Sequence, residues 1–177
     1  TGEVEGRKTW QGYSDNSTWA RGQAWAIYGF TMTYRETRDQ RYLDAATRAA
    51  DWYLERLPED MIPFWDFNVE QEGFTPDYRS YAVEYTGADK KDASAAAIVC
   101  SALFELAELS GNAAYSEKAL AMLESLASPA YRAPVGENGG FMIMHCTGGL
   151  PQHVEIDVPL VYADYYFMES LVRYNKL

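Results

Sequence analysis

The stretch DQRYLDAA, residues 39–46, recurs in altered form as NAAYSEKA, residues 112–119. In both copies a tyrosine and then an alanine follow a short break in a helical pattern, at spacings that put them on one helix face. These two side chains are placed to dock the new helix against the preceding one. Tight turns between helices produce antiparallel pairs, so the repeat predicts two helical hairpins.

Apolar periodicity predicts five main helices, the last without a partner, over residues 18–37, 40–57, 91–109, 112–126 and 159–174. Two long stretches, 58–90 and 128–158, are predicted to be irregular, functional loops. The pattern is typical of an all-α helical repeat or α/α toroid, in one domain spanning residues 1–177. The first, third and fifth helices would line one concave face.

Three inner and two outer helices cannot close a ring, so large apolar flanks are expected on the first and fifth helices. Further chain or an oligomer would cover them. The chain begins with Thr1 rather than Met, and we expect it to be a fragment.

Composition excludes several classes of function. The net charge of −11 provides no basic stripe for nucleic acid and disfavours an acidic membrane surface, and we expect no transmembrane segment. Two cysteines are too few for a disulfide framework and lack metal-type spacing, so no metal site is expected. The aromatic content of 15% is high, as it often is in carbohydrate-binding proteins.

The segment NSTWARGQAWAIYGF, residues 16–30, places Arg21 and Trp25 on one helix face, just after Trp19 and the N-cap candidate Ser17. Two indole faces and a planar guanidinium suit a flat anionic ring. An ordinary amphipathic helix whose arginine reaches water over a tryptophan is the alternative that spacing alone leaves open. A pocket arginine of this kind would contribute little to folding.

Three blocks resemble the unsaturated glucuronyl hydrolases, glycoside hydrolase family 88: STWARGQAWAIYG (17–29, preceded by WQG at 10–12), KDASAAAI (91–98) and EIDVPLVYADYYFMES (155–170). They run in family order along nearly the whole chain. The resemblance implies the C-terminal half of an (α/α)6 barrel, which would account for the helix count. It implies a bacterial cytoplasmic or periplasmic glycosidase, and the sequence does not decide between these compartments.

The family implies removal of a 4,5-unsaturated uronic acid from oligosaccharides released by polysaccharide lyases, as in glycosaminoglycan degradation. The implied reaction is hydration: a carboxylic acid protonates C4, water adds at C5, and the hemiketal opens and expels the neighbouring sugar. It needs a carboxyl of raised pKa, a group that positions it and a stacking surface, but no metal or organic cofactor.

Carried over residue by residue, the family's substrate-binding positions match Gln11, Trp19, Arg21 and Trp25. A second set of substrate-binding candidates comprises Trp65, which is alternatively part of the rim, together with Phe141 and His145, near a neighbouring-sugar subsite. Asp92 and Asp164 are expected to act as a helix cap and a helix hydrogen-bonding group.

The family's two catalytic aspartates lie in upstream motifs that these residues lack, so we expect no catalytic residue in this chain. Activity would then need the N-terminal half of the barrel as partner. A non-catalytic carbohydrate-binding helical module and an unsaturated rhamnogalacturonyl hydrolase remain alternatives. The polysaccharide, its sulfation and the oligomeric state stay open.

Overall fold

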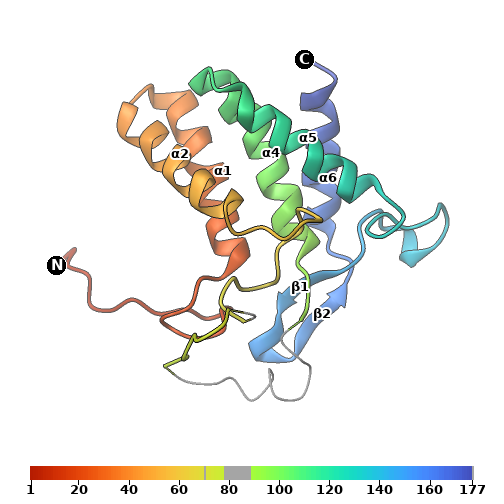
Figure 1. The fold of residues 1–177 in the computed structure, drawn as a ribbon, viewed down its shortest axis with the longest axis horizontal. Coiled ribbons are helices and arrows are strands. Elements are labelled where there is room, and N and C mark those ends of the chain that lie inside the picture. Colours follow the sequence, from red (N-terminus) through yellow and green to blue (C-terminus); the bar gives the residue numbers. More distant parts are fainter. Residues whose placement is uncertain (70, 78–88, 177) are drawn as a thin grey trace.

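The computed structural model describes residues 1–69, 71–77 and 89–176 (Figure 1). Within these residues the chain forms five α-helices: α1 (Ala20–Thr37), α2 (Gln40–Leu54), α4 (Ala93–Ser110), α5 (Ala113–Ala127) and α6 (Val161–Tyr174). Each lies where the sequence predicts a helix, with every end within about three residues of the predicted one. Part of the predicted loop 58–90 lies outside the described residues.

The helices form two layers. α4 packs between α1 and α6 to make one row, while α2 packs on α1 and α5 packs on α4 (Figure 1). The hairpins α1–α2 and α4–α5 are the two predicted from the repeat, and the row α1–α4–α6 is the predicted set of inner helices. α4 is the core of the fold, since thirteen of its residues are buried.

The repeated tyrosines and alanines dock as predicted. Ala46 and Ala119 are fully buried, and Tyr42 stacks on Phe30 of α1 with ring centroids 6.3 Å apart. Tyr115 is buried and donates a 2.6 Å hydrogen bond to Asp51, which ties the two outer helices α2 and α5 together.

One of the described helices, α4, is both long and strongly apolar. By length and composition alone it could cross a membrane, although no transmembrane segment was expected. However, 78% of that window is buried inside the fold, as in the core helix of a globular protein. We therefore assign α4 to the core.

The stretch 128–158 is not wholly irregular. It contains an antiparallel hairpin of β1 (Cys146–Gly149) and β2 (Val154–Val158), joined by the 3-10 turn η2 (Leu150–Gln152) and preceded by η1 (Asn138–Gly140). β1 is short and contains two glycines, so it gives no strand signal. β2 does alternate, with Val154, Ile156 and Val158 on either side of two acidic residues, and the sequence prediction did not use that signal. Both acidic residues, Glu155 and Asp157, have positive φ. The hairpin packs β1 against α4 and leaves the fold class all-α.

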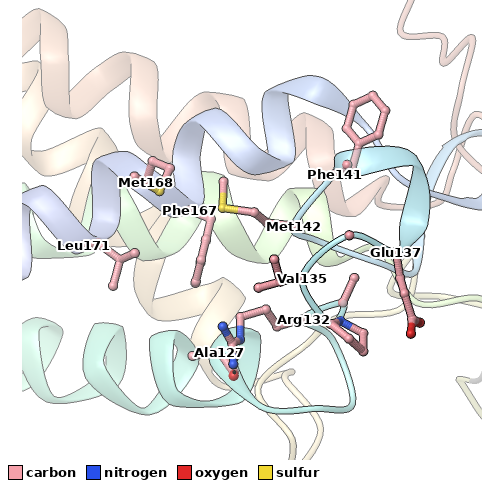
Figure 2. Close-up of a pocket in the computed structure, with 13 residues that line it drawn as sticks. Ala127, Arg132, Val135, Glu137, Phe141, Met142, Phe167, Met168 and Leu171 are labelled. Carbon is pink, nitrogen blue, oxygen red and sulfur yellow. Dashed lines mark hydrogen bonds between the residues drawn. The ribbon is translucent and has the colours of Figure 1, made fainter.

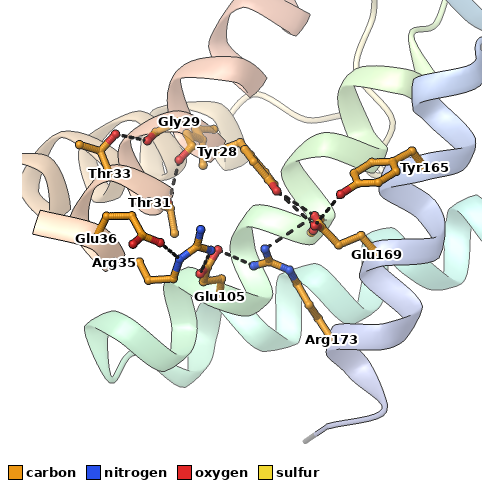
Figure 3. Close-up of polar contacts among 12 residues, drawn as sticks. Tyr28, Gly29, Thr31, Thr33, Arg35, Glu36, Glu105, Tyr165, Glu169 and Arg173 are labelled. Carbon is orange, nitrogen blue, oxygen red and sulfur yellow. Dashed lines mark hydrogen bonds and ion pairs between the residues drawn. The ribbon is translucent and has the colours of Figure 1, made fainter.

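A charged network ties the inner helices together at their C-terminal ends (Figure 3). The carboxylate of Glu105 on α4 accepts hydrogen bonds of 2.6 Å from Arg35 on α1 and from Arg173 on α6. Nearby, Glu169 on α6 accepts from Tyr28 of α1 and Ser101 of α4. The row of inner helices is thus cross-linked by polar side chains.

Glu105 should make stability depend on acid pH. Burial opposes ionisation of this carboxyl, but hydrogen bonds and charges from Arg173 and Arg35 lower its pKa below 4.5 overall. A carboxyl whose folded pKa is lowered contributes stability above its unfolded pKa and loses it as pH falls through the folded value. We expect Glu105→Gln to unfold at lower urea than wild type at pH 7, with the difference shrinking below about pH 4.5. A pH-independent difference would contradict this role.

One face of α6 is exposed and apolar. Residues facing α4 are buried, whereas four large side chains on the opposite side remain exposed: Val161, Tyr165, Met168 and Val172. The same face of the helix borders a groove of about 510 Å³. One wall of the groove is formed by Met168 together with Phe167 and Leu171, and the opposite wall by the loop that carries Val135 and Met142 (Figure 2). An apolar surface of this kind is typical of an interface.

Isolated residues 1–177 should therefore associate or bind a hydrophobic dye. We expect a concentration-dependent shift to larger species in light scattering. Met168→Gln combined with Val172→Gln should reduce it, because both side chains are on the exposed face. The matched control is Val4→Gln, which changes an exposed valine far from α6 in the sequence. A monomer that binds no dye at any concentration would contradict the prediction.

Candidate functional site

The start of α1 differs in one respect from expectation. Ser17 is not the N-cap; its hydroxyl donates to Asp66 at 2.7 Å. Trp19 occupies the N-cap position instead, and its side chain makes no capping hydrogen bond. The prediction was wrong because α1 begins at Ala20, two residues later than expected, and the Ser17 hydroxyl oxygen accepts from the Ser14 amide instead.

The segment 63–67, which forms two isolated β-bridges, joins the starts of two inner helices. The backbone carbonyl of Trp65 accepts from Ala20 of α1 at 3.0 Å, and its amide donates to Lys90 at 2.9 Å. The carbonyl of Pro63 accepts from Asp92, the N-cap of α4, at 3.0 Å. The amino-terminal ends of α1 and α4 are thereby brought together.

Arg21 lies buried between these ends, 3% exposed. Its Nη1 pairs with Asp92 at 2.8 Å and donates to the Thr147 carbonyl at 2.7 Å, while Nη2 donates to the Gly148 carbonyl. The guanidinium thus joins α1, α4 and the β-hairpin. The expectation that Arg21 contributes little to folding is therefore wrong.

Trp19 covers the guanidinium. The centre of the Arg21 side-chain cation lies 4.9 Å from the Trp19 ring centroid. Gly22 makes this placement possible: a Cβ there would lie 2.8 Å from the ring. The order Trp-Ala-Arg-Gly lets the indole fold back over the first turn of α1, where it remains half-buried.

Aromatic rings extend the site along the inner face. Tyr162 of α6 lies 5.6 Å from the Arg21 cation, and Trp25 of α1 lies 6.3 Å from the Tyr162 ring. Trp25 also packs edge-on against Tyr166 at 5.5 Å and is 38% exposed. Burial raises the pKa of Tyr162 to about 12, so its hydroxyl stays protonated at neutral pH.

Gln11 joins the cluster through the hairpin. Its side-chain amide donates to the Gly148 carbonyl at 2.8 Å, the same oxygen that Arg21 engages. Glu155 of β2 lies against the Cα of Gly148: a Cβ there would lie 2.6 Å from the Glu155 Cβ. The four main candidates thus belong to one connected arrangement.

The second set of candidates lies elsewhere. Trp65 is 1% exposed and packs edge-on against Tyr13, so its ring presents no surface to a ligand. Phe141 lines the groove beside α6. His145 lines a separate cavity of about 290 Å³ and pairs with Asp157 at 2.6 Å.

The two aspartates predicted to be structural hold the backbone. Asp92 caps α4 by accepting from the Ser94 amide, as expected. Asp164, on α6, accepts instead from the amides of Met142 and Ile143 in the preceding loop, both at 2.9 Å. Asp66 is also buried, which raises the pKa of its carboxyl despite four stabilising hydrogen bonds.

Sequence reasoning missed the roles of Tyr162 and of the Thr147–Gly148 carbonyls. Tyr162 and Tyr166 are four residues apart on a predicted inner helix, and that spacing could have indicated a shared aromatic face. Carbonyl contacts leave no trace in the sequence. Among the residues described, no group of three His, Cys, Asp or Glu side chains could hold a metal ion.

Comparison with known proteins identifies relatives along the whole chain. An unsaturated glucuronyl hydrolase of Formosa agariphila is 45% identical over 179 aligned residues, covering 100% of this chain and 41% of that protein. A protein of the same name from Bacillus sp. is 33% identical, covering 95% and 42%. No family model matches the chain.

Solved structures of unsaturated glucuronyl hydrolases are also similar to this chain. A crystal structure of an unsaturated glucuronyl hydrolase specific for heparin has a TM-score of 0.85 at 39% identity, covering 99% of this chain and 44% of that one. A Streptococcus agalactiae mutant enzyme complexed with dGlcA-GalNAc6S has a TM-score of 0.77 at 29% identity. This chain spans less than half the length of these relatives. They are (α/α)6 barrel enzymes, so the expected half-barrel is confirmed.

Replacing Arg21 should destabilise the fold. Arg21→Ala leaves the Asp92 carboxylate buried without its ion-pair partner, a change that typically costs about 3–5 kcal/mol. The control is Arg41→Ala, which removes an exposed partner of the N-cap Asp39 and should cost under about 1 kcal/mol. Urea unfolding of the protein that carries this chain measures both. Equal midpoints for the two variants would contradict the structural role of Arg21.

Proposed function

Because this chain belongs to the family of unsaturated glucuronyl hydrolases, we propose that it forms the substrate-binding wall of such an enzyme. The enzyme would remove a 4,5-unsaturated uronic acid from the non-reducing end of lyase-generated oligosaccharides. The observation that carries the proposal is the connected cluster of Trp25, Tyr162, Arg21 and Trp19, in a chain that aligns with its relatives from end to end.

The cluster suits a flattened, anionic sugar ring. Trp25 and Trp19 keep partly exposed indole faces, and stacking on such faces requires no particular substituent on the sugar. The hydrogen bonds of Arg21 engage Nη1 and one hydrogen of Nη2, so the Nε edge would donate toward the sugar carboxylate. Gln11 would fix the hairpin beside the ring.

The chemistry would be hydration of the enol ether. A carboxylic acid protonates C4, positive charge develops at C5 and the ring oxygen, and water adds at C5. The hemiketal then opens and releases the neighbouring sugar. The residues of this chain would bind and orient the ring and keep bulk water from one of its faces.

We propose that residues 1–177 are part of one larger catalytic domain. The relatives are more than twice as long, and the exposed apolar face of α6 offers a surface for the remainder of the domain. That remainder would supply the acid, because no carboxyl group here matches the family's proton donor.

Turnover of an unsaturated disaccharide tests the proposal, by loss of absorbance of the conjugated C4=C5 bond. We expect the intact protein to turn it over. Arg21→Lys should lower kcat/KM by about a hundredfold, equivalent to about 3 kcal/mol, because it keeps the charge and loses the planar fork. The control Arg41→Lys, on the exposed side of α2, should match wild type.

Three outcomes would change the assignment. Binding of the sugar without turnover by the intact protein would favour a non-catalytic carbohydrate-binding module. Selective turnover of unsaturated rhamnogalacturonan fragments would favour the related hydrolases. Turnover by isolated residues 1–177 would show that an acid within this chain, such as Asp66 or Asp92, performs the protonation.

A further inference from the structure

The carboxylate of Asp92 makes two different kinds of contact. Oδ1 accepts from the Ser94 amide at 3.1 Å, the Ser94 hydroxyl at 2.5 Å and the Thr147 amide at 3.4 Å. Oδ2 accepts from Arg21 at 2.8 Å. One oxygen therefore caps α4, and the other holds the guanidinium.

Capping alone does not require a charge at this position. Asparagine is as good an N-cap as aspartate, and Asn112 caps α5 through the same contact, an amide two residues later at 3.1 Å. A fully buried carboxylate is costly unless it is paired, and Asp92 is fully buried. Its charge is therefore explained by Arg21 rather than by the helix.

The pair also holds the hairpin backbone. The Thr147 amide donates a hydrogen bond to Asp92, and the Thr147 carbonyl accepts one from Arg21. Both members of the ion pair therefore bind the backbone of this residue. The next carbonyl, that of Gly148, accepts from Arg21 and from Gln11. Rotation of the guanidinium would therefore displace the hairpin as well as the Nε edge and the overlying Trp19.

We propose that Asp92 is a positioning residue for the sugar site, orienting Arg21 and, through it, residues 147–148 and Gln11. This inference deepens the proposed function and rests on it. Buried ion pairs add little net stability compared with apolar packing, whereas they can fix one geometry. Asp92 itself would not touch the sugar, because Arg21 and Thr147 lie over its two oxygens.

Asp92→Asn separates the two kinds of contact, because the amide keeps an oxygen to cap α4 and loses the charge. The matched control is Asp39→Asn at the start of α2. Asp39 is also an N-cap aspartate paired with an arginine, but it is partly exposed rather than fully buried. In the intact enzyme, misplacement of a binding group costs on the order of a hundredfold in kcat/KM. We expect a loss of this size from Asp92→Asn, mostly through KM, and none from Asp39→Asn.

A double-mutant cycle tests whether Asp92 acts through Arg21. If it does, adding Asp92→Asn to Arg21→Ala should cause no further loss of kcat/KM and should restore part of the lost stability, because no unpaired buried charge then remains. Additive losses of kcat/KM from the two substitutions would overturn the proposal.

Amide hydrogen exchange distinguishes this inference from the proposed function. Asp92→Asn should speed exchange in residues 146–149, and Asp39→Asn should not. Unchanged exchange at these amides overturns the inference whatever the kinetics show. Faster exchange in a protein that neither binds nor turns over unsaturated uronates would refute the proposed function and leave Asp92 with a structural role only, which also overturns its role at a sugar site.

Discussion

The buried ion pair between Arg21 and Asp92 is the contact on which the arrangement of the site depends. The two residues lie 71 positions apart and belong to α1 and α4, and the pair also binds the carbonyls of the β-hairpin. Two charges removed from water must satisfy their hydrogen-bonding groups locally. The surrounding carbonyls and the Ser94 hydroxyl do so, which restricts both helices and the hairpin to one relative placement.

A second polar network performs a similar task at the opposite ends of the same helices. Glu105 links Arg35 and Arg173, so α1, α4 and α6 are cross-linked at their C-terminal ends, while the Arg21–Asp92 pair joins α1 and α4 at their N-terminal ends. Small and apolar residues of α4 fill the space between the networks. The aromatic residues Trp25 and Tyr162 therefore lie on a stiff support, which would limit the entropy lost if a sugar ring stacked on them.

The helices could be predicted because their evidence is local: periodicity, breaks at Arg38 and Gly111, and a repeated tyrosine and alanine. The grouping of Gln11, Trp19, Arg21 and Trp25 followed from motifs. The burial of Arg21 could not be predicted, since its partners come from α4 and β1, far along the chain. The hairpin was missed because the glycine-rich β1 gives no strand signal, which left the alternating residues of β2 without a recognisable pairing strand.

The residues of this chain form only one side of the proposed sugar site. Trp25 and the apolar face of α6 remain exposed, while the cation that could attract a uronate is buried and already paired with Asp92. Paired in this way, Arg21 adds little net charge, in a chain whose charge is −11. Attraction of an anionic sugar would therefore depend on the directed Nε edge and on exclusion of water, which strengthens a hydrogen bond to a charged group. A wall supplied from outside these residues would exclude that water, so tight binding and proton transfer would require the same closure.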